Sequence, residues 1–385
     1  MAQKLLMNGM NANDRQFDAI ELLQRLIACE SCDPPGNEIH VARLVHDQFL
    51  AFGIQAELDE FLPGRANVLG RIRGTREKSS LVLSAHLDTV PVGAFPWSFG
   101  PFSGAIRDGR VLGRGASDMK GAVVAMIGAA VQINQRHAPL KGDILLAFSA
   151  GESSDCLGAK RFVSRGIRDE MGALLVGEPS SMDVVIVEKA ALWLRVRAEG
   201  RTGHVSGNPG INAIDAMTDF LRAAQSIQFE CPPHPLLDGP TLRVGRISGG
   251  SAVNLTPDIC LAEIDIRLPP NIAPGTAIEK LRQIAAGGIF IETIDFKPAV
   301  ESDPGSPFVS VCVQACESML GKRPDIKGVS YYSDAVVLSA GLDIPFAIVG
   351  PGDLGMSGQP NESVSIERIL AAARVYEQVA DQWLS

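Results

Sequence analysis

The chain has 385 residues, 46% of them hydrophobic and 21% charged, which is normal for a folded globular protein. This length is too great for one small core and suits two domains of ordinary size. A net charge of -9, without clusters of Lys or Arg, argues against a nucleic-acid-binding surface, so we expect no nucleic-acid partner.

The N-terminal stretch MAQKLLMNGMNANDRQFDAI lacks the apolar run of a signal peptide. We also see no stretch near the roughly 20 apolar residues that a membrane helix needs. The seven cysteines are odd in number and scattered, which is typical of reduced thiols. We therefore expect a cytoplasmic protein with no membrane partner.

The first half of the chain alternates strands and helices. Apolar runs predict strands at 79–88, 143–150, 172–179 and 183–190, and helices at 121–135 and 156–166. The same pattern returns near the C-terminus, with a helix at 306–320, a strand at 344–352 and a helix at 366–384. This rhythm predicts an α/β domain with a mostly parallel sheet flanked by helices.

The middle of the chain has a different order of elements. A strand at 191–200, a helix at 212–227, strands at 241–250 and 258–268, a helix at 276–287 and a strand at 289–296 form a βαββαβ unit. We expect this ferredoxin-like unit to be inserted into the α/β domain. The predicted bounds are 1–189 and 300–385 for the catalytic domain and 190–299 for the insertion.

Several polar residues with metal-ligand chemistry follow the apolar runs. His86 and Asp88 end one predicted strand and point to the same side, since side chains two residues apart in a strand share a face. Asp118 precedes a helix, and Glu152 and Glu178 end two further strands. Because an open α/β sheet places its chemistry at the carboxyl ends of its strands, we expect these side chains to form one site. A core histidine satisfied by a neighbouring Asp is the alternative for His86 and Asp88 alone.

Motifs along nearly the whole chain resemble those of the acetylornithine deacetylase and succinyl-diaminopimelate desuccinylase family, which includes aminoacylases and zinc exopeptidases. They are AHLDTVPVG, GRVLGRGASDMKGAVVAM, VGEPS, GRTGHVSGNPGINAI, GGSAVNLTPD and SDAVVLSAGLDIPFAIVGPGDLGMSGQPNESV. The resemblance implies a two-zinc hydrolase of N-acyl amino acids or small peptides. It also implies that the inserted domain pairs two chains into a homodimer.

By position, the resemblance assigns a role to each candidate residue. His86 and Glu178 would hold one zinc, Asp118 would bridge it towards a second, Asp88 would orient His86, and Glu152 would be the general base that takes a proton from zinc-bound water. His204 would stabilise the oxyanion in the partner's site. Asn254 and Arg267 would bind the carboxylate of the substrate.

The resemblance implies that both residues that would bind only the second zinc are missing. The family has a Glu directly after the base, where this chain has Ser153, and a His four residues before Glu362, where it has Gly358. Asp118 alone provides too few ligands for a stable second site. Asp155, Ser357 and Gln359 lie nearby in sequence, but oxygen ligands of this kind bind zinc weakly.

We therefore expect one zinc per chain, with manganese or cobalt as alternatives, and Glu152 working beside it without a second acid. The favoured function is a metal-dependent amidohydrolase that removes an acyl group from an N-acyl amino acid or cleaves a small dipeptide-like amide. Two alternatives stay open. In the first, the same group of site residues is adapted to a different biosynthetic step on an amino-acid-like substrate. In the second, the protein is a non-catalytic ligand-binding relative. Retention of Glu152 argues against the last.

Overall fold

The computed structural model describes residues 16–136, 139–207 and 210–385. The chain forms two compact units. Unit 1 consists of the residues up to Ile186 together with Ser302–Lys327 and Ser333–Ser385, and unit 2 consists of Val187–Glu301 and Gly328–Tyr332. Compared with the bounds expected from the sequence, unit 2 contains the additional short segment 328–332.

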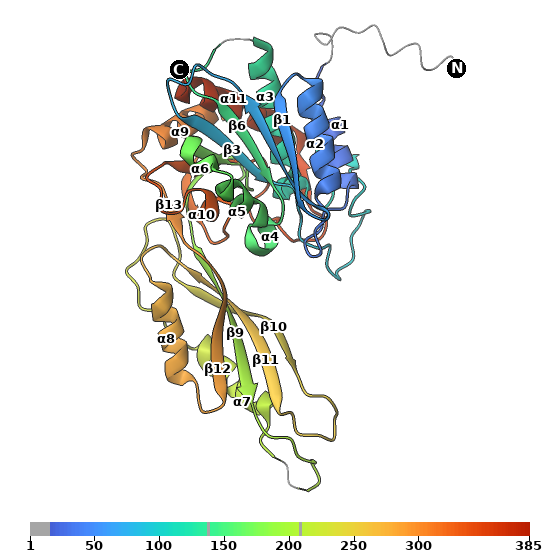
Figure 1. Cartoon of the computed structure of the whole chain (residues 1–385), viewed down its shortest axis with the longest axis vertical. Coiled ribbons are helices and arrows are strands. Elements are labelled where there is room, and N and C mark those ends of the chain that lie inside the picture. The colour runs from blue at the N-terminus through green and yellow to red at the C-terminus, as the bar shows by residue number, and fades with distance from the viewer. Residues whose placement is uncertain (1–15, 137–138, 208–209) are drawn as a thin grey trace, which may run out of the picture. The chain divides into compact units, whose positions relative to one another are not determined.

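The larger sheet has nine strands, in the order β1-β2-β6-β3-β7-β15-β8-β13 with β14 paired to β8. Figure 1 labels β1, β6 and β3 among its strands. Its strands are β1 Gln55–Leu62, β2 Arg65–Ile72, β3 Ser80–His86, β6 Ile144–Ser149, β7 Met171–Val176, β8 Val184–Glu188, β13 Val300–Glu301, β14 Ile326–Val329 and β15 Phe346–Ile348. The middle strands β6, β3, β7 and β15 are parallel, as the sequence predicts, whereas the strands at both edges are antiparallel. Every residue of β3 and β6 is buried, which is typical of parallel strands covered on both faces.

Helices cover this sheet. They are α1 Ala19–Ala28, α2 Ile39–Ala51, α3 Gly121–Arg136, α4 Glu152–Asp155, α5 Leu157–Ser164, α6 Ile167–Glu170, α9 Pro307–Leu320, α10 Ala335–Leu338 and α11 Ile366–Trp383. Helix α3 packs against α1, α11 and strand β3.

One helical stretch corrects the expectation that no segment reaches membrane-spanning length. Ala116–Arg136 is long and apolar enough to cross a membrane by composition, but 89% of its most apolar window is buried inside the protein. Such burial is typical of a core helix.

A small antiparallel sheet places the C-terminal segment beside the turn at residues 116–120. It has the order β16-β5-β4, with bounds β4 Ile106–Arg107, β5 Arg110–Leu112 and β16 Ser363–Ser365. After β5 the chain turns at Gly115, whose φ of 83° favours glycine, and enters a π-helical turn, η2 Ala116–Lys120, which leads into α3. The pairing of β16 with β5 holds residues just before Ser363 next to this turn.

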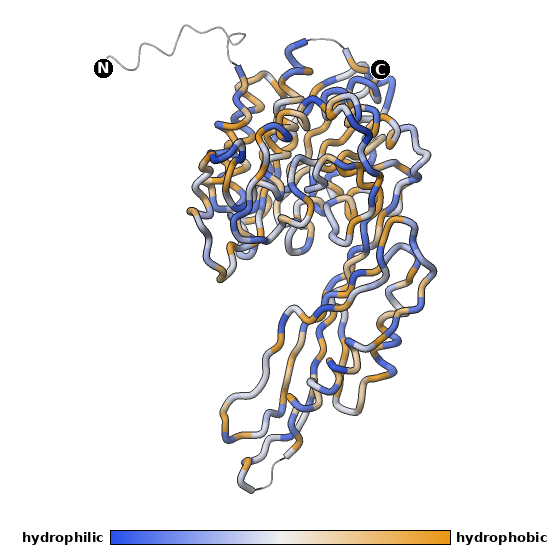
Figure 2. The backbone as a smooth tube through the Cα atoms, turned by 180° about the vertical axis from the view of Figure 1, so that it is seen from behind, coloured by the Kyte–Doolittle hydropathy of each residue, from blue (hydrophilic) through white to orange (hydrophobic). Residues whose placement is uncertain are grey.

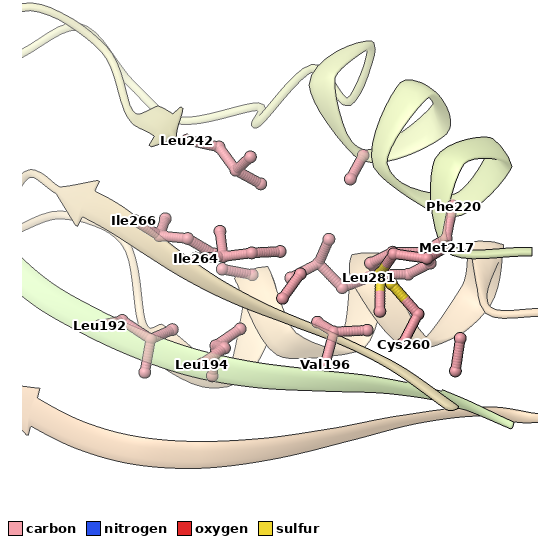
Figure 3. Close-up of a cluster of buried hydrophobic side chains, with 14 of the residues drawn as sticks. Leu192, Leu194, Val196, Met217, Phe220, Leu242, Cys260, Ile264, Ile266 and Leu281 are labelled. Atoms are coloured by element: carbon pink, nitrogen blue, oxygen red, sulfur yellow. The ribbon is translucent and has the colours of Figure 1, made fainter. Parts of the chain in front are cut away.

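Unit 2 is an antiparallel sheet of order β10-β11-β9-β12 with helices α7 and α8. The bounds are β9 Ala190–Glu199, α7 Ala213–Gln225, β10 Thr241–Gly249, β11 Ile259–Leu268, α8 Pro274–Ile284 and β12 Ile289–Lys297. Hydrophobic and hydrophilic segments alternate along its strands (Figure 2). Side chains such as Leu194, Ile264 and Phe220 from β9, β11 and α7 meet in one buried cluster (Figure 3). This is the βαββαβ order that the sequence predicts.

Candidate metal centre

Three neighbouring parallel strands bring the candidate residues to one edge of the larger sheet. His86 is the last residue of β3 and pairs with Ser149, the last residue of β6. Glu152 follows β6 and Glu178 follows β7. Ligand atoms of His86, Glu152 and Glu178 all lie within 4.8 Å of one another, and all three residues are buried. The strand order therefore assembles side chains that are far apart in sequence.

The imidazole of His86 is held on both sides. Its Nδ1 lies 3.0 Å from the backbone oxygen of Asp88, and its Nε2 lies 3.0 Å from Oδ1 of Asp118 and 3.4 Å from Oε1 of Glu178. A carbonyl oxygen can only accept a hydrogen bond, so Nδ1 carries the proton. In the neutral ring, Nε2 then presents its lone pair to two carboxylates.

This donor set fits a metal ion. A nitrogen lone pair and two carboxylate oxygens are all acceptors, so they meet favourably only around a cation. One His and two carboxylates are ligands that zinc takes in proteins. The residues whose oxygens contact Nε2 of His86, and which could hold the metal with it, are Asp118 and Glu178, while Glu152 lies beside them.

The pKa values of the cluster agree with this interpretation. Burial is the largest single influence on His86 and lowers its pKa, but the carboxylates of Glu178, Asp118 and Asp88 together raise it well above the usual value. The imidazole of His86 therefore binds a proton readily between the carboxylates, at the place where a metal cation would also be stabilised. Burial raises the pKa of Glu152 well above its usual value; His86 opposes this, while Asp334 and Asp88 raise it further.

The carboxylate of Asp88 faces the loop that carries Glu152. It accepts hydrogen bonds from the backbone N–H of Glu152 at 3.1 Å, from the backbone N–H of Ser153 at 3.0 Å and from the Ser153 hydroxyl at 2.7 Å. Its Oδ1 lies 3.7 Å from Nδ1 of His86. Asp88 thus contacts the imidazole mainly through its backbone carbonyl, and its side chain fixes the position of residues 152 and 153.

Asp118 is held by the C-terminal segment. The buried carboxylate of Glu362 accepts hydrogen bonds from the backbone N–H groups of Ser117 at 2.9 Å and Asp118 at 3.0 Å. The Ser357 hydroxyl donates to Oδ2 of Asp118. Arg114, which is 1% exposed, forms an ion pair with Glu362. These contacts leave Oδ1 of Asp118 directed at His86.

Ser153 and Gly358, the positions where the sequence analysis expects the ligands of a second zinc to be missing, make other contacts. The hydroxyl of Ser153 is bonded to Asp88, as above. Gly358 has a φ of +73°, and its backbone oxygen accepts a hydrogen bond from Arg114 at 3.2 Å. A second acidic group in the described chain, Asp33, Glu38 and Asp88, already contains a cation, because Arg65 bonds to Asp33 and Glu38.

The three remaining candidates lie in unit 2. His204 and Asn254 are neighbours, since His204 forms a bridge with Leu255 and Val205 donates its N–H to the backbone oxygen of Asn254. His204 is exposed and its Nδ1 lies 2.7 Å from the Ser206 hydroxyl.

Arg267 lies near the other end of β11. Its guanidinium binds Asp265 through two contacts of 2.8 Å and lies over the ring of Tyr332, 5.0 Å from its centroid. Nη1 of Arg267 is buried and, within the described residues, has no hydrogen-bond partner. Unit 2 thus brings His204 and Asn254 together but not Arg267.

Known proteins share this fold and this sequence pattern. The model of peptidase family M20/M25/M40 matches residues 82–382, so the chain belongs to this family of metallohydrolases that act on amide bonds. It is 24% identical to a probable succinyl-diaminopimelate desuccinylase of Staphylococcus epidermidis, covering 95% of this chain and 98% of that protein. It is 27% identical to an acetylornithine deacetylase of Vibrio cholerae, covering 90% and 92%.

Solved structures agree on the fold. An M20 family metallo-carboxypeptidase of Sulfolobus solfataricus superimposes with a TM-score of 0.78 at 17% identity, covering 95% of this chain and 99% of that chain. The di-peptidase Dug1p of Saccharomyces cerevisiae gives 0.77 at 14% identity, covering 94% and 96%. The fold of this chain is therefore shared over nearly its whole length by these two solved structures.

Proposed function

We propose that this hydrolase removes the acyl group from an N-acyl amino acid, or cleaves a small dipeptide-like amide, with one zinc ion held by His86, Asp118 and Glu178. The observation that carries the proposal is that Nε2 of His86 lies 3.0 Å from a carboxylate oxygen of Asp118 and 3.4 Å from one of Glu178 at the sheet edge. The names of the relatives, desuccinylase, deacetylase and di-peptidase, support the substrate class. Manganese or cobalt would suit the same ligands.

When bound, the metal would supply Lewis-acid chemistry that polarises the amide carbonyl and lowers the pKa of water. Glu152 is the general base: its carboxylate takes the proton of the attacking water and passes it to the leaving amine nitrogen. Its position within 4.8 Å of His86 and Glu178 supports this role.

A second copy of the chain completes the site. His204 of the partner subunit donates a hydrogen bond to the developing oxyanion, and Asn254 and Arg267 bind the substrate carboxylate. Two exposed apolar side chains beside these loops, Val205 at 57% and Val253 at 102% exposure, support a covering partner. Nη1 of Arg267, which has no hydrogen-bond partner in the part of the chain that the structure describes, suits a carboxylate ligand.

A substrate panel tests the proposed function. N-acetyl and N-succinyl amino acids and simple dipeptides are offered to the zinc-loaded protein, and released amine is measured before and after chelation. We expect hydrolysis of at least one class and its loss with the metal. A zinc-loaded protein that hydrolyses no member of the panel would exclude the function as stated.

A further inference from the structure

The C-terminal loop that ends at Glu362 contains no histidine, yet it touches the candidate metal ligand Asp118. Ser357 is exposed at the surface, and its hydroxyl donates to Oδ2 of Asp118. The other oxygen, Oδ1, faces Nε2 of His86. The two oxygens of the Asp118 carboxylate therefore differ: Oδ1 is available to a metal, and Oδ2 accepts a hydrogen bond from a hydroxyl.

The loop is anchored on both sides of Ser357. Before it, the backbone N–H of Asp353 donates to the Ser117 hydroxyl at 2.9 Å. After it, the guanidinium of Arg114 donates to the backbone oxygens of Gly358 at 3.2 Å and Gln359 at 3.3 Å. Arg114 is buried, and its guanidinium carbon lies 5.1 Å from the centroid of the Trp97 ring.

We infer that Ser357 is a positioning residue that makes Asp118 a ligand of one metal only. Its hydroxyl fixes the rotation of the carboxylate and occupies the oxygen through which Asp118 would otherwise reach a second ion. Hydrogen bonds to a ligating carboxylate orient it, and their loss typically weakens metal binding 10–100-fold. The inference rests on the proposed zinc centre, since it assigns Ser357 to the same site.

The experiment measures zinc binding of the full chain by competition with a chelator, together with the number of ions per chain. Ser357→Ala should bind the first zinc about 10–100-fold more weakly than the wild type. Ser357→Thr keeps a hydroxyl and should restore most of the affinity. Gln359→Ala is the control from the same loop, because the backbone oxygen of Gln359, which accepts the hydrogen bond from Arg114, survives the change.

Three results would contradict the inference. Ser357→Ala with unchanged affinity would show that the hydroxyl does not position Asp118. Equal losses in Ser357→Ala and Gln359→Ala would indicate a general disturbance of the loop. A wild type with two ions that loses one on Ser357→Ala, with the tighter site unaffected, would make Ser357 itself a ligand. A wild type that binds no zinc at all would instead overturn the proposed function.

Discussion

Asn254 lies in the loop that precedes strand β11, whereas Arg267 lies near the far end of the same strand. Roughly 27 Å of strand separates Ile259 from Arg267, at about 3.4 Å per residue. A small amino-acid derivative cannot span this distance. If Asn254 and Arg267 bind one substrate, they come from different chains, and His204 comes with Asn254.

This relationship predicts complementation between two inactive variants. Glu152→Ala and His204→Ala should each be inactive alone. After subunit exchange, each mixed dimer contains one site with an intact Glu152 and an intact partner His204, so activity should reappear. Each variant exchanged with itself is the control. A mixture that stays inactive although exchange is demonstrated would show that His204 does not act in the neighbouring chain.

Glu152→Gln tests the general base. The amide keeps the size of the side chain and cannot take the proton, so we expect turnover to fall at least about a hundredfold while zinc content and fold stay unchanged. Glu170→Gln is a matched control, because Glu170 immediately precedes β7 at its amino end and pairs with Arg71. Near-normal turnover of Glu152→Gln would exclude Glu152 as the general base and favour a different reaction at the same site residues.

The double variant Ser153→Glu with Gly358→His tests whether a second zinc site was lost through two substitutions. Both changes restore ligands of suitable type, and a Cβ on Gly358 meets only Val90, at 3.9 Å. A histidine in the positive-φ conformation of Gly358 lowers the free energy of unfolding by on the order of 1 kcal/mol. The two single variants should therefore be tested separately for folding. We expect one additional zinc per chain, held by the two new ligands together with Oδ2 of Asp118, from which the ion displaces the Ser357 hydroxyl. A double variant that is folded but binds no additional ion would mean that the surrounding geometry has also diverged.

Glu38 should make stability depend on pH. Burial raises its pKa from 4.5 to about 7, and Asp88 contributes in the same direction. Because the folded pKa exceeds the unfolded value, its stabilising contribution is complete below about pH 4.5 and is lost as the pH rises to about 7. Across this window the unfolding free energy of the wild type should fall relative to Glu38→Gln by on the order of 3 kcal/mol. Chemical denaturation of both proteins measures the difference, and a pH-independent difference would show that Glu38 is not held protonated.

The sequence predicts the parts of the site that depend on local pattern. Long apolar runs indicate β3, β6 and β7, and the polar residues that follow them must meet because parallel strands end together. The contacts of Ser357 and Glu362 with the Asp118 turn were not predicted. They depend on the pairing of β16 with β5, which joins residues about 250 positions apart. A local pattern in the sequence does not predict such a pairing.

The loop after β6 illustrates a second limit. The resemblance implies that Ser153 stands where the family has an acid, but it does not show where the hydroxyl points. In the structure it bonds to Asp88, together with the N–H groups of residues 152 and 153. The direction of a short side chain in a tight turn depends on its neighbours in space, so the contact of Ser153 with Asp88 could not be predicted from the sequence.

The proposed centre of His86, Asp118 and Glu178 binds one metal ion, and its direct test is the zinc content per chain. The protein is loaded with excess zinc, dialysed exhaustively and measured by elemental analysis alongside its concentration. With His86, Asp118 and Glu178 as the ligands, and Ser153 and Gly358 in place of the others, we predict about one tightly held zinc per chain. Two zinc ions per chain would contradict the account and would require ligands for the second ion that it does not contain.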